Sequence, residues 1–295
     1  MSAINERPKG RQTGLEAALA SALTPGREAP PRLWEAIRFA VFPGGARIRP
    51  NLCLAVAGAD RCAAPEVALG TACALELLHC ASLVHDDLPC FDDADLRRGK
   101  PSVHRAYGQP LAVLAGDALI VAAFEIAAAG ASRQPQLLPG LIRGLSTAAG
   151  ASRGLIAGQG WESEPSIALD AYHRAKTGSL FVAATTLGAY AAGRDPEPWR
   201  AVGEHLGAAY QVADDLLDAH ASSQLEGKPT GRDFALGRPS AVATHGTAGA
   251  VDRLRHLVDE AAAAVPPCPG AAGIRRMVVQ MAERLVPPSL RQTAA

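Results

Sequence analysis

Two clusters of aspartates limit what this chain of 295 residues can fold into. The first lies in residues 86–93 and the second in residues 214–218, and each ends a long apolar segment. Because burying unpaired carboxylates is very costly, each cluster must face a polar cavity or a cation. Oxygen ligands with few His or Cys neighbours suit Mg²⁺. The candidate metal ligands are Asp86, Asp87, Asp92, Asp214, Asp215 and Asp218.

The composition excludes several classes of function. Lys plus Arg and Asp plus Glu number 29 each, so no basic excess indicates nucleic acid binding. The six cysteines show no CxxC spacing and are interpreted as buried thiols of a reducing cytosol. The N-terminus lacks the apolar region of a signal peptide, and no uninterrupted apolar run reaches the length of a membrane span. We therefore expect a cytoplasmic protein with no membrane span.

The pattern of apolar residues predicts an all-α fold. Ala and Leu recur at three- and four-residue spacing, and short Gly/Pro breaks separate segments of helical length. The segment 66–87 is apolar almost all round, which indicates a central helix. In the segment 206–218, Gln211 lies one turn before the second cluster. We expect a single domain over residues 1–295, with its core at about 31–281 and frayed ends.

Cationic residues accompany both clusters, as a bound diphosphate would require. They include a basic turn in a glycine-rich loop at residues 44–50, where backbone N–H groups can also meet an anion. No Walker A, GxGxxG or nucleophile-elbow motif is present. The candidate donors are Arg47, Arg49, Arg97, Arg98, Lys176, Lys228 and Arg232.

At these motifs the chain resembles the trans-isoprenyl diphosphate synthases, and most of all the geranylgeranyl diphosphate synthases of bacterial carotenoid and bacteriochlorophyll pathways. The motifs occur in the family's order: DDxxxxD at residue 86, RRGKP at 97, GQ at 158, KTG at 176 and QxxDDxxD at 211. The resemblance implies the isoprenoid synthase fold, with roughly a dozen helices around a deep central cavity, and a homodimer. It also implies Mg²⁺, three ions with diphosphate bound, and condensation of isopentenyl diphosphate with a dimethylallyl, geranyl or farnesyl diphosphate.

The resemblance also assigns roles to individual residues. Lys176, Thr177 and Gln211 are the implied catalytic residues. The residues implied to bind allylic diphosphate are Arg97, Lys176 and Lys228, with Thr177 and Gln211 beside the reacting carbons. Those implied to bind isopentenyl diphosphate are Arg49, His79 and Arg98. Gln159 and Glu162 resemble the family's third polar pair.

The chain departs from the family pattern at two cations. Ala46 stands where the glycine-rich loop usually carries Lys, and we expect Arg47 to compensate. Arg238 stands at a later Lys position, which keeps the charge but changes its geometry.

Product length is expected to depend on the wall below the first aspartates. Ala81 and Ser82 lie five and four residues before Asp86 and are small, which leaves room for a twenty-carbon chain. Leu77 and Leu78, about one turn deeper, are the candidate floor.

Three alternatives stay open. A farnesyl diphosphate synthase would have a floor elsewhere in the cavity. A class I terpene cyclase generally carries a different second metal motif and needs no basic isopentenyl site. A non-catalytic partner subunit tends to lose one acidic motif, and both are intact here.

Overall fold

The computed structural model describes residues 9–42, 45–220 and 240–285. The segment from Pro287 onward, expected to fray, lies outside these residues. So do the predicted donors Lys228, Arg232 and Arg238.

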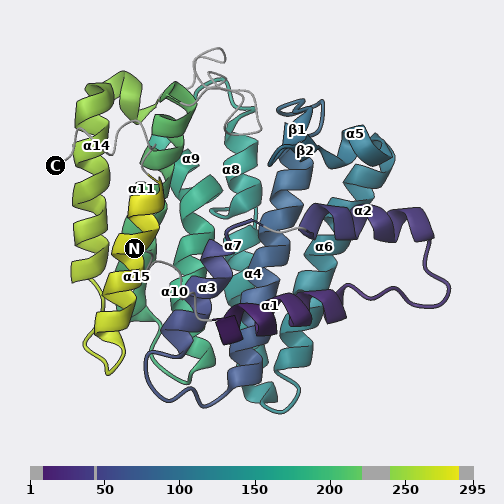
Figure 1. Ribbon diagram of the computed structural model, residues 1–295, viewed down its shortest axis with the longest axis horizontal. Coiled ribbons are helices and arrows are strands. Elements are labelled where there is room, and N and C mark those ends of the chain that lie inside the picture. Colours follow the sequence, from purple (N-terminus) through teal and green to yellow (C-terminus); the bar gives the residue numbers. More distant parts are fainter. Residues whose placement is uncertain (1–8, 43–44, 221–239, 286–295) are drawn as a thin grey trace, which may run out of the picture.

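The described chain is helical almost throughout, which confirms the all-α prediction (Figure 1). Its α-helices are α1 (Lys9–Ala22), α2 (Pro31–Val41), α3 (Ile48–Ala57), α4 (Pro65–Asp86), α5 (Val103–Tyr107), α6 (Gln109–Gly130), α7 (Leu138–Ala149), α8 (Leu155–Trp161), α9 (Leu169–His173), α10 (Ser179–Ala191), α11 (Arg200–His220), α14 (Ala241–Ala263) and α15 (Ala271–Leu285). Two 3₁₀ turns, η1 (Pro135–Leu137) and η3 (Glu197–Trp199), and one π-helical segment, η2 (Arg174–Gly178), join some of them. A short antiparallel pair, β1 (Leu96–Arg97) and β2 (Lys100–Pro101), forms the only sheet in the described part.

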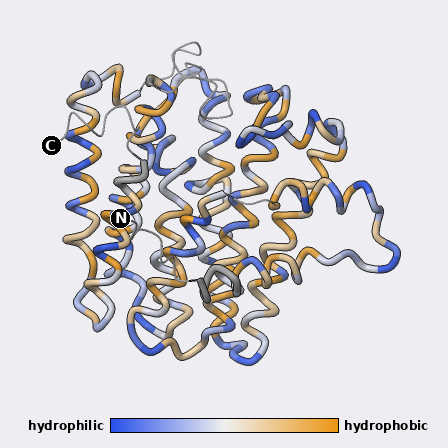
Figure 2. Tube along the Cα trace, viewed as in Figure 1, coloured by the Kyte–Doolittle hydropathy of each residue, from blue (hydrophilic) through white to orange (hydrophobic). Residues whose placement is uncertain are grey.

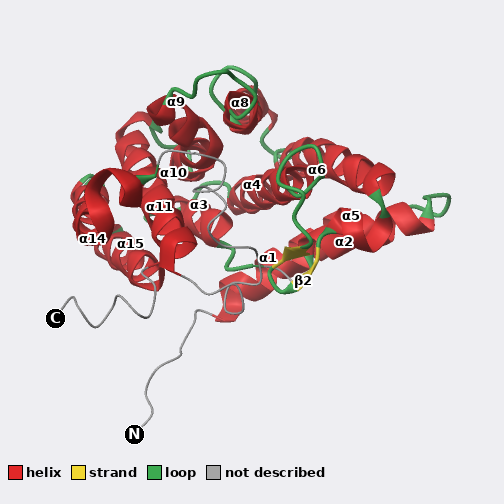
Figure 3. Ribbon diagram, turned by 90° about the horizontal axis from the view of Figure 1, so that it is seen from above, coloured by secondary structure: helices red, strands yellow, loops and turns green. Residues whose placement is uncertain are grey.

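Helix α4 is the central element, as its apolar sequence predicts. It lies in the middle of the bundle when the molecule is seen from above, with α3, α6 and α10 around it (Figure 3). Of its apolar 18-residue window, 78% is buried. The structure begins this helix at Pro65 and ends it at Asp86, within one residue of the predicted bounds. Proline suits a first helical position because it has no N–H to leave unbonded.

The buried core begins earlier in the chain than predicted. Helix α1 packs on α4, and Leu15, Leu19 and, directly after the helix, Leu23 are each no more than 1% exposed. These leucines recur at i, i+4 and i+8, so they form one apolar stripe on the helix. Residues before the predicted limit at about residue 31 therefore contribute to the buried core.

Helices α4 and α11 bring their carboxyl ends to the same end of the bundle, at the top of Figure 1. Each ends in one of the two aspartate clusters. The negative end of a helix dipole favours cations, so two such ends create a strong local demand for positive charge.

By length and composition alone, α4 and α6 could each cross a membrane. Since α4 is largely buried, it meets this test as the core helix of a globular fold. Helix α6 differs, because only 33% of its apolar window is buried, and Val113, Leu114 and Val121 are 41%, 50% and 66% exposed. Hydrophilic residues gather instead at the turns, as in the loop between α1 and α2 (Figure 2). Helix α6 therefore carries an exposed apolar face.

Candidate functional site

One cavity of about 760 Å³ connects the two aspartate clusters. Asp86 lines it from the end of α4, Asp92 from the following loop, and Asp214 and Asp218 from α11. This volume is within the usual range for small-molecule sites. The prediction that the two acidic helix ends face a shared cavity is confirmed.

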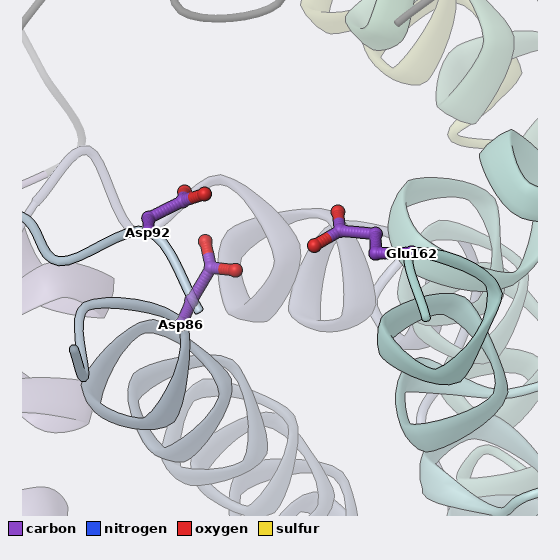
Figure 4. A group of neighbouring side chains, drawn as sticks. All are labelled: Asp86, Asp92 and Glu162. Carbon is purple, nitrogen blue, oxygen red and sulfur yellow. The ribbon is translucent and has the colours of Figure 1, made fainter. Parts of the chain in front are cut away.

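Three carboxylates converge at one side of the cavity (Figure 4). Asp86 comes from the last turn of α4, Asp92 from the following loop, and Glu162 from the end of α8. Ligand oxygens of all three lie within 4.8 Å of one another. This separation fits a single hard cation such as Mg²⁺, which prefers oxygen ligands.

Lys176 bridges two of these carboxylates. Its Nζ donates to Asp86 Oδ1 at 3.1 Å and to Glu162 Oε1 at 2.5 Å. Glu162 also accepts hydrogen bonds from Tyr172 Oη at 2.7 Å and Gln159 Nε2 at 3.0 Å. Burial alone would lower the pKa of Lys176, but Asp86, Tyr172 and Glu162 together raise it, so the ammonium stays charged.

The π-helical segment places Lys176 and Thr177 side by side on the cavity wall. Neighbouring helices approach its backbone closely. A Cβ on Gly158 of α8 would lie 2.4 Å from the backbone N of Lys176, and one on Gly207 of α11 would lie 2.6 Å from Gly178 Cα. π-helical turns occur frequently at functional sites. The segment is thus fixed between two helices at points where only glycine fits.

A second polar chain fixes Gln211. Its Oε1 accepts the Thr177 hydroxyl at 2.8 Å, and its Nε2 donates to Asp215 Oδ1 at 3.0 Å. Asp215 Oδ2 also accepts the backbone N–H of Ala241 at 2.6 Å, at the start of α14. Asp215 is only 4% exposed. In the structure its carboxylate anchors α14 and orients Gln211, and its role as a metal ligand stays a prediction.

Asp87 is bound by a cation of the protein itself. Its carboxylate accepts hydrogen bonds from Arg97, with Nε at 3.0 Å from Oδ1, and a shorter contact from Nη2. Burial raises the pKa of Asp87, and Arg97 offsets part of that shift. Asp87 is therefore the ion-pair partner of Arg97, which itself lines the cavity, and its role as a metal ligand stays a prediction.

A basic cluster also lines the cavity and consists of Arg49, His79 and Arg98. Arg49 Nη1 lies 3.4 Å from His79 Nε2, and the Arg49 guanidinium stacks 4.7 Å from the Phe181 ring centroid and 5.4 Å from that of Tyr210. Arg49 is 7% exposed, and its Nε is buried without a hydrogen-bond partner.

These contacts make the basic cluster a place for an anion. Burial lowers the pKa of Arg49. Burial, followed by Arg49, lowers the pKa of His79 well below its usual value, so this imidazole is neutral. A buried guanidinium with an unused donor is costly unless an anion joins it.

Arg47 lies away from the cavity, contrary to the prediction that it replaces the missing lysine. Its side chain is fully buried and is bound by Glu16 and Glu76. A guanidinium held by two carboxylates cannot also bind substrate phosphate at full strength, so this geometry does not support the predicted substrate contact, which stays a prediction.

The apolar wall matches the prediction in part. Leu78, Ala81 and Ser82 line the cavity, together with Ile120 of α6 and Ala149 of α7. Leu77 is 0% exposed and belongs to the hydrophobic core, so it is not part of this wall. Residues on α4 alternate between cavity and core because successive side chains point about 100° apart.

Sequence reasoning missed several residues of the site. Tyr172 donates a hydrogen bond to Glu162, and the rings of Phe181 and Tyr210 pack against the Arg49 guanidinium. None of these contacts is between neighbours in the sequence. Glu76 had a detectable signal, because it is the one carboxylate between Glu66 and Asp86 in an apolar helix and therefore had to have a buried partner.

Comparisons with known proteins agree with this geometry. The polyprenyl synthetase family model matches residues 30–267. A geranylgeranyl diphosphate synthase of Cereibacter sphaeroides is 54% identical over 275 residues, 92% of this chain and 96% of that one. A farnesyl diphosphate synthase of Geobacillus stearothermophilus is 35% identical over 272 residues, 88% of each chain. A Helicobacter pylori geranyltransferase, solved with magnesium and isoprenyl diphosphate, matches with a TM-score of 0.80 at 29% identity, over 95% of this chain and 99% of that one. The chain belongs to the polyprenyl synthetase family.

Proposed function

We propose that this protein is a Mg²⁺-dependent prenyltransferase that condenses isopentenyl diphosphate with an allylic diphosphate, 1'-4 and head to tail, to give geranylgeranyl diphosphate. The observation that carries the proposal is the single cavity in which an acidic side, a basic cluster and an apolar wall meet.

The acidic side fits Mg²⁺. Asp86, Asp92 and Glu162 offer oxygens within 4.8 Å of one another, and Asp214 and Asp218 face them from α11. When bound there, Mg²⁺ would neutralise the allylic diphosphate and stabilise it as a leaving group. The proposal includes three ions, as the resemblance implies.

The chain's own residues would position both substrates. Arg97 and Lys176 lie beside the carboxylates, where they would hold the allylic diphosphate. The basic cluster Arg49, His79 and Arg98 would hold isopentenyl diphosphate. A diphosphate oxygen would accept a hydrogen bond from Arg49 Nε, which has no partner in the protein.

The reaction then needs little further protein chemistry. The C1–O bond of the allylic diphosphate breaks, and its electron pair leaves with the diphosphate. The double bond of isopentenyl diphosphate attacks C1, and the released diphosphate accepts the proton that is lost. Thr177 and Gln211 line the cavity between the two sides, where their oxygen dipoles would face the developing cation.

The apolar wall supports a twenty-carbon product. Ala81 lies five residues from Asp86, or about 7.5 Å along the helix axis. With only small side chains at Ala81 and Ser82, the chain can grow past them toward Leu78, Ile120 and Ala149. The greater similarity to geranylgeranyl diphosphate synthases than to the farnesyl diphosphate synthase supports the same product.

A product assay tests this function. Purified protein would be incubated with Mg²⁺, isopentenyl diphosphate and each allylic starter, and the dephosphorylated products would be sized by chromatography. We expect a twenty-carbon prenyl alcohol. A fifteen-carbon product would make the protein a farnesyl diphosphate synthase, a cyclic hydrocarbon would make it a cyclase, and no turnover would indicate a partner subunit.

We also propose that the protein is a cytoplasmic homodimer that pairs through the exposed apolar face of α6. Contiguous exposed apolar surface commonly marks an interface. The double variant Leu114→Lys/Val121→Lys should run as a monomer in size-exclusion chromatography with light scattering, while the wild type runs as a dimer. Surface exposure of both residues, 50% and 66%, means that the monomer itself should still fold.

A further inference from the structure

A buried and heavily paired guanidinium, that of Arg47, lies outside the cavity lining. Arg47 Nε donates to Glu16 Oε1 at 2.8 Å, and Nη2 donates to Glu16 Oε2 at 3.2 Å. Nη1 donates to Glu76 Oε1 at 2.6 Å, and Nη2 donates to the Val41 carbonyl at 3.0 Å. We call Glu16, Arg47 and Glu76 the anchor cluster. It joins α1, the start of α3 and α4.

The anchor cluster lies next to the basic cluster in two ways. Arg47 directly precedes α3, and Arg49 stands in the first turn of that helix. On α4, Glu76 and His79 lie three residues apart, so they are neighbours on one face. The two helices are thus joined by Arg47 with Glu76 and by Arg49 with His79.

The backbone at Arg47 requires such an anchor. Its φ of 50° and ψ of 42° are left-handed, a conformation that non-glycine residues seldom adopt. Burial would lower the pKa of Arg47, but the hydrogen bonds and charges of Glu16 and Glu76 raise it overall. The two carboxylates therefore compensate for both the burial and the strained backbone.

The same loop supports Arg98. A Cβ on Gly45 would lie 2.5 Å from Arg98 Cζ, so the guanidinium rests directly on this glycine. Since Ala46 supplies no cation, the site depends on the placement of Arg49 and Arg98.

We infer that the anchor cluster positions the basic cluster, so that Glu16 of the N-terminal helix α1 helps to set the affinity for isopentenyl diphosphate. Glu16, Arg47 and Glu76 are positioning residues, which act through Arg49 and Arg98 without contacting substrate. This inference rests on the proposed function and adds a determinant for one of its two substrates.

The test uses Glu16→Gln, which keeps the size of the side chain and removes its charge. We expect KM for isopentenyl diphosphate to rise about tenfold, as the loss of a charged hydrogen bond implies, while KM for the allylic diphosphate stays unchanged. Glu76→Gln should act in the same direction, and Glu16→Asp should recover part of the affinity. The matched control is Glu66→Gln, a glutamate of α4 that forms an exposed ion pair with Arg133.

A second measurement separates this inference from the proposed function. Titration calorimetry with isopentenyl diphosphate alone, without Mg²⁺ or starter, should show the same weakening in Glu16→Gln. If the wild type makes no prenyl product but Glu16→Gln still weakens binding, the function fails and the inference stands. If Glu16→Gln lowers only the melting temperature, or raises both KM values equally, the anchor is merely structural and the inference is overturned.

Discussion

The substitution Lys176→Met tests how the acidic side is held in the absence of metal. The ammonium lies 3.1 Å from Asp86 and 2.5 Å from Glu162, and its side chain is 24% exposed. At an effective dielectric constant of about 20, each contact corresponds to a gross attraction of roughly 5–7 kcal/mol. Desolvation cancels most of this attraction, but removing one partner of a buried pair still costs about 3–5 kcal/mol.

The expected result is a less stable protein whose stability depends on Mg²⁺. For a chain of this size, a loss of 3–5 kcal/mol corresponds to a fall in melting temperature of about 6–20 °C. Because a bound cation would replace the missing ammonium, Mg²⁺ at about 100 times its Kd should raise the free energy of unfolding of the variant by about 2.7 kcal/mol. Differential scanning fluorimetry with and without Mg²⁺ measures both effects. Activity should fall as well, since Lys176 also belongs to the proposed allylic diphosphate site.

Lys100→Met is the matched control, because Lys100 is exposed in the β1–β2 hairpin. It should change neither the melting temperature nor its response to Mg²⁺. The reasoning is refuted if Lys176→Met melts at the wild-type temperature, or if its response to Mg²⁺ equals that of the wild type.

Three further predictions concern the cavity. Ala81→Tyr places a phenol ring in the wall and should shorten the product to fifteen carbons; an unchanged chain length on chromatography would contradict this account. Asp214→Ala should lower kcat at least about hundredfold in a radiometric assay, as the loss of one electrostatic contact to a transition state typically does. In His79, burial and Arg49 depress the pKa of the folded state, so below about pH 6.5 the unfolded chain binds the extra proton. The free energy of unfolding therefore falls as pH decreases through this window. His79→Gln should reduce the slope of this free energy against pH, measured by urea titrations, by up to roughly 1.4 kcal/mol per pH unit. An unchanged slope would mean that His79 is charged in the native state.

Local patterns in the sequence were sufficient for much of the architecture. The central helix was predicted at residues 66–87 and found at Pro65–Asp86, because a mostly apolar run without Gly/Pro breaks other than Gly70, between a proline and two aspartates, leaves few other conformations. The family assignment and the shared cavity were likewise confirmed, since the motif spacing determines which helix ends carry carboxylates.

Roles that depend on distant partners could not be predicted. Arg47 was predicted to donate hydrogen bonds to a substrate phosphate. Its contacts with Glu16 and Glu76, 31 and 29 residues away, have no signal in the neighbouring sequence. Asp215 looked like its neighbour Asp214, but a helix turns adjacent side chains about 100° apart, and only the position of α14 shows which partner Asp215 meets. Similarly, the spacing of Leu15, Leu19 and Leu23 indicates an apolar stripe, but only the structure shows that this stripe packs on α4.

The π-helical segment at Arg174–Gly178 has a consequence for how this protein can change in evolution. Deleting one residue there would restore α-helical register and turn the chain on one side of the segment by about 100° relative to the other. Lys176 would leave Asp86 and Glu162, and Gly158 and Gly207 would meet the wrong atoms. The exposed Arg174 can vary in identity, but the number of residues cannot. Insertions and deletions should therefore be tolerated far less than substitutions in this stretch.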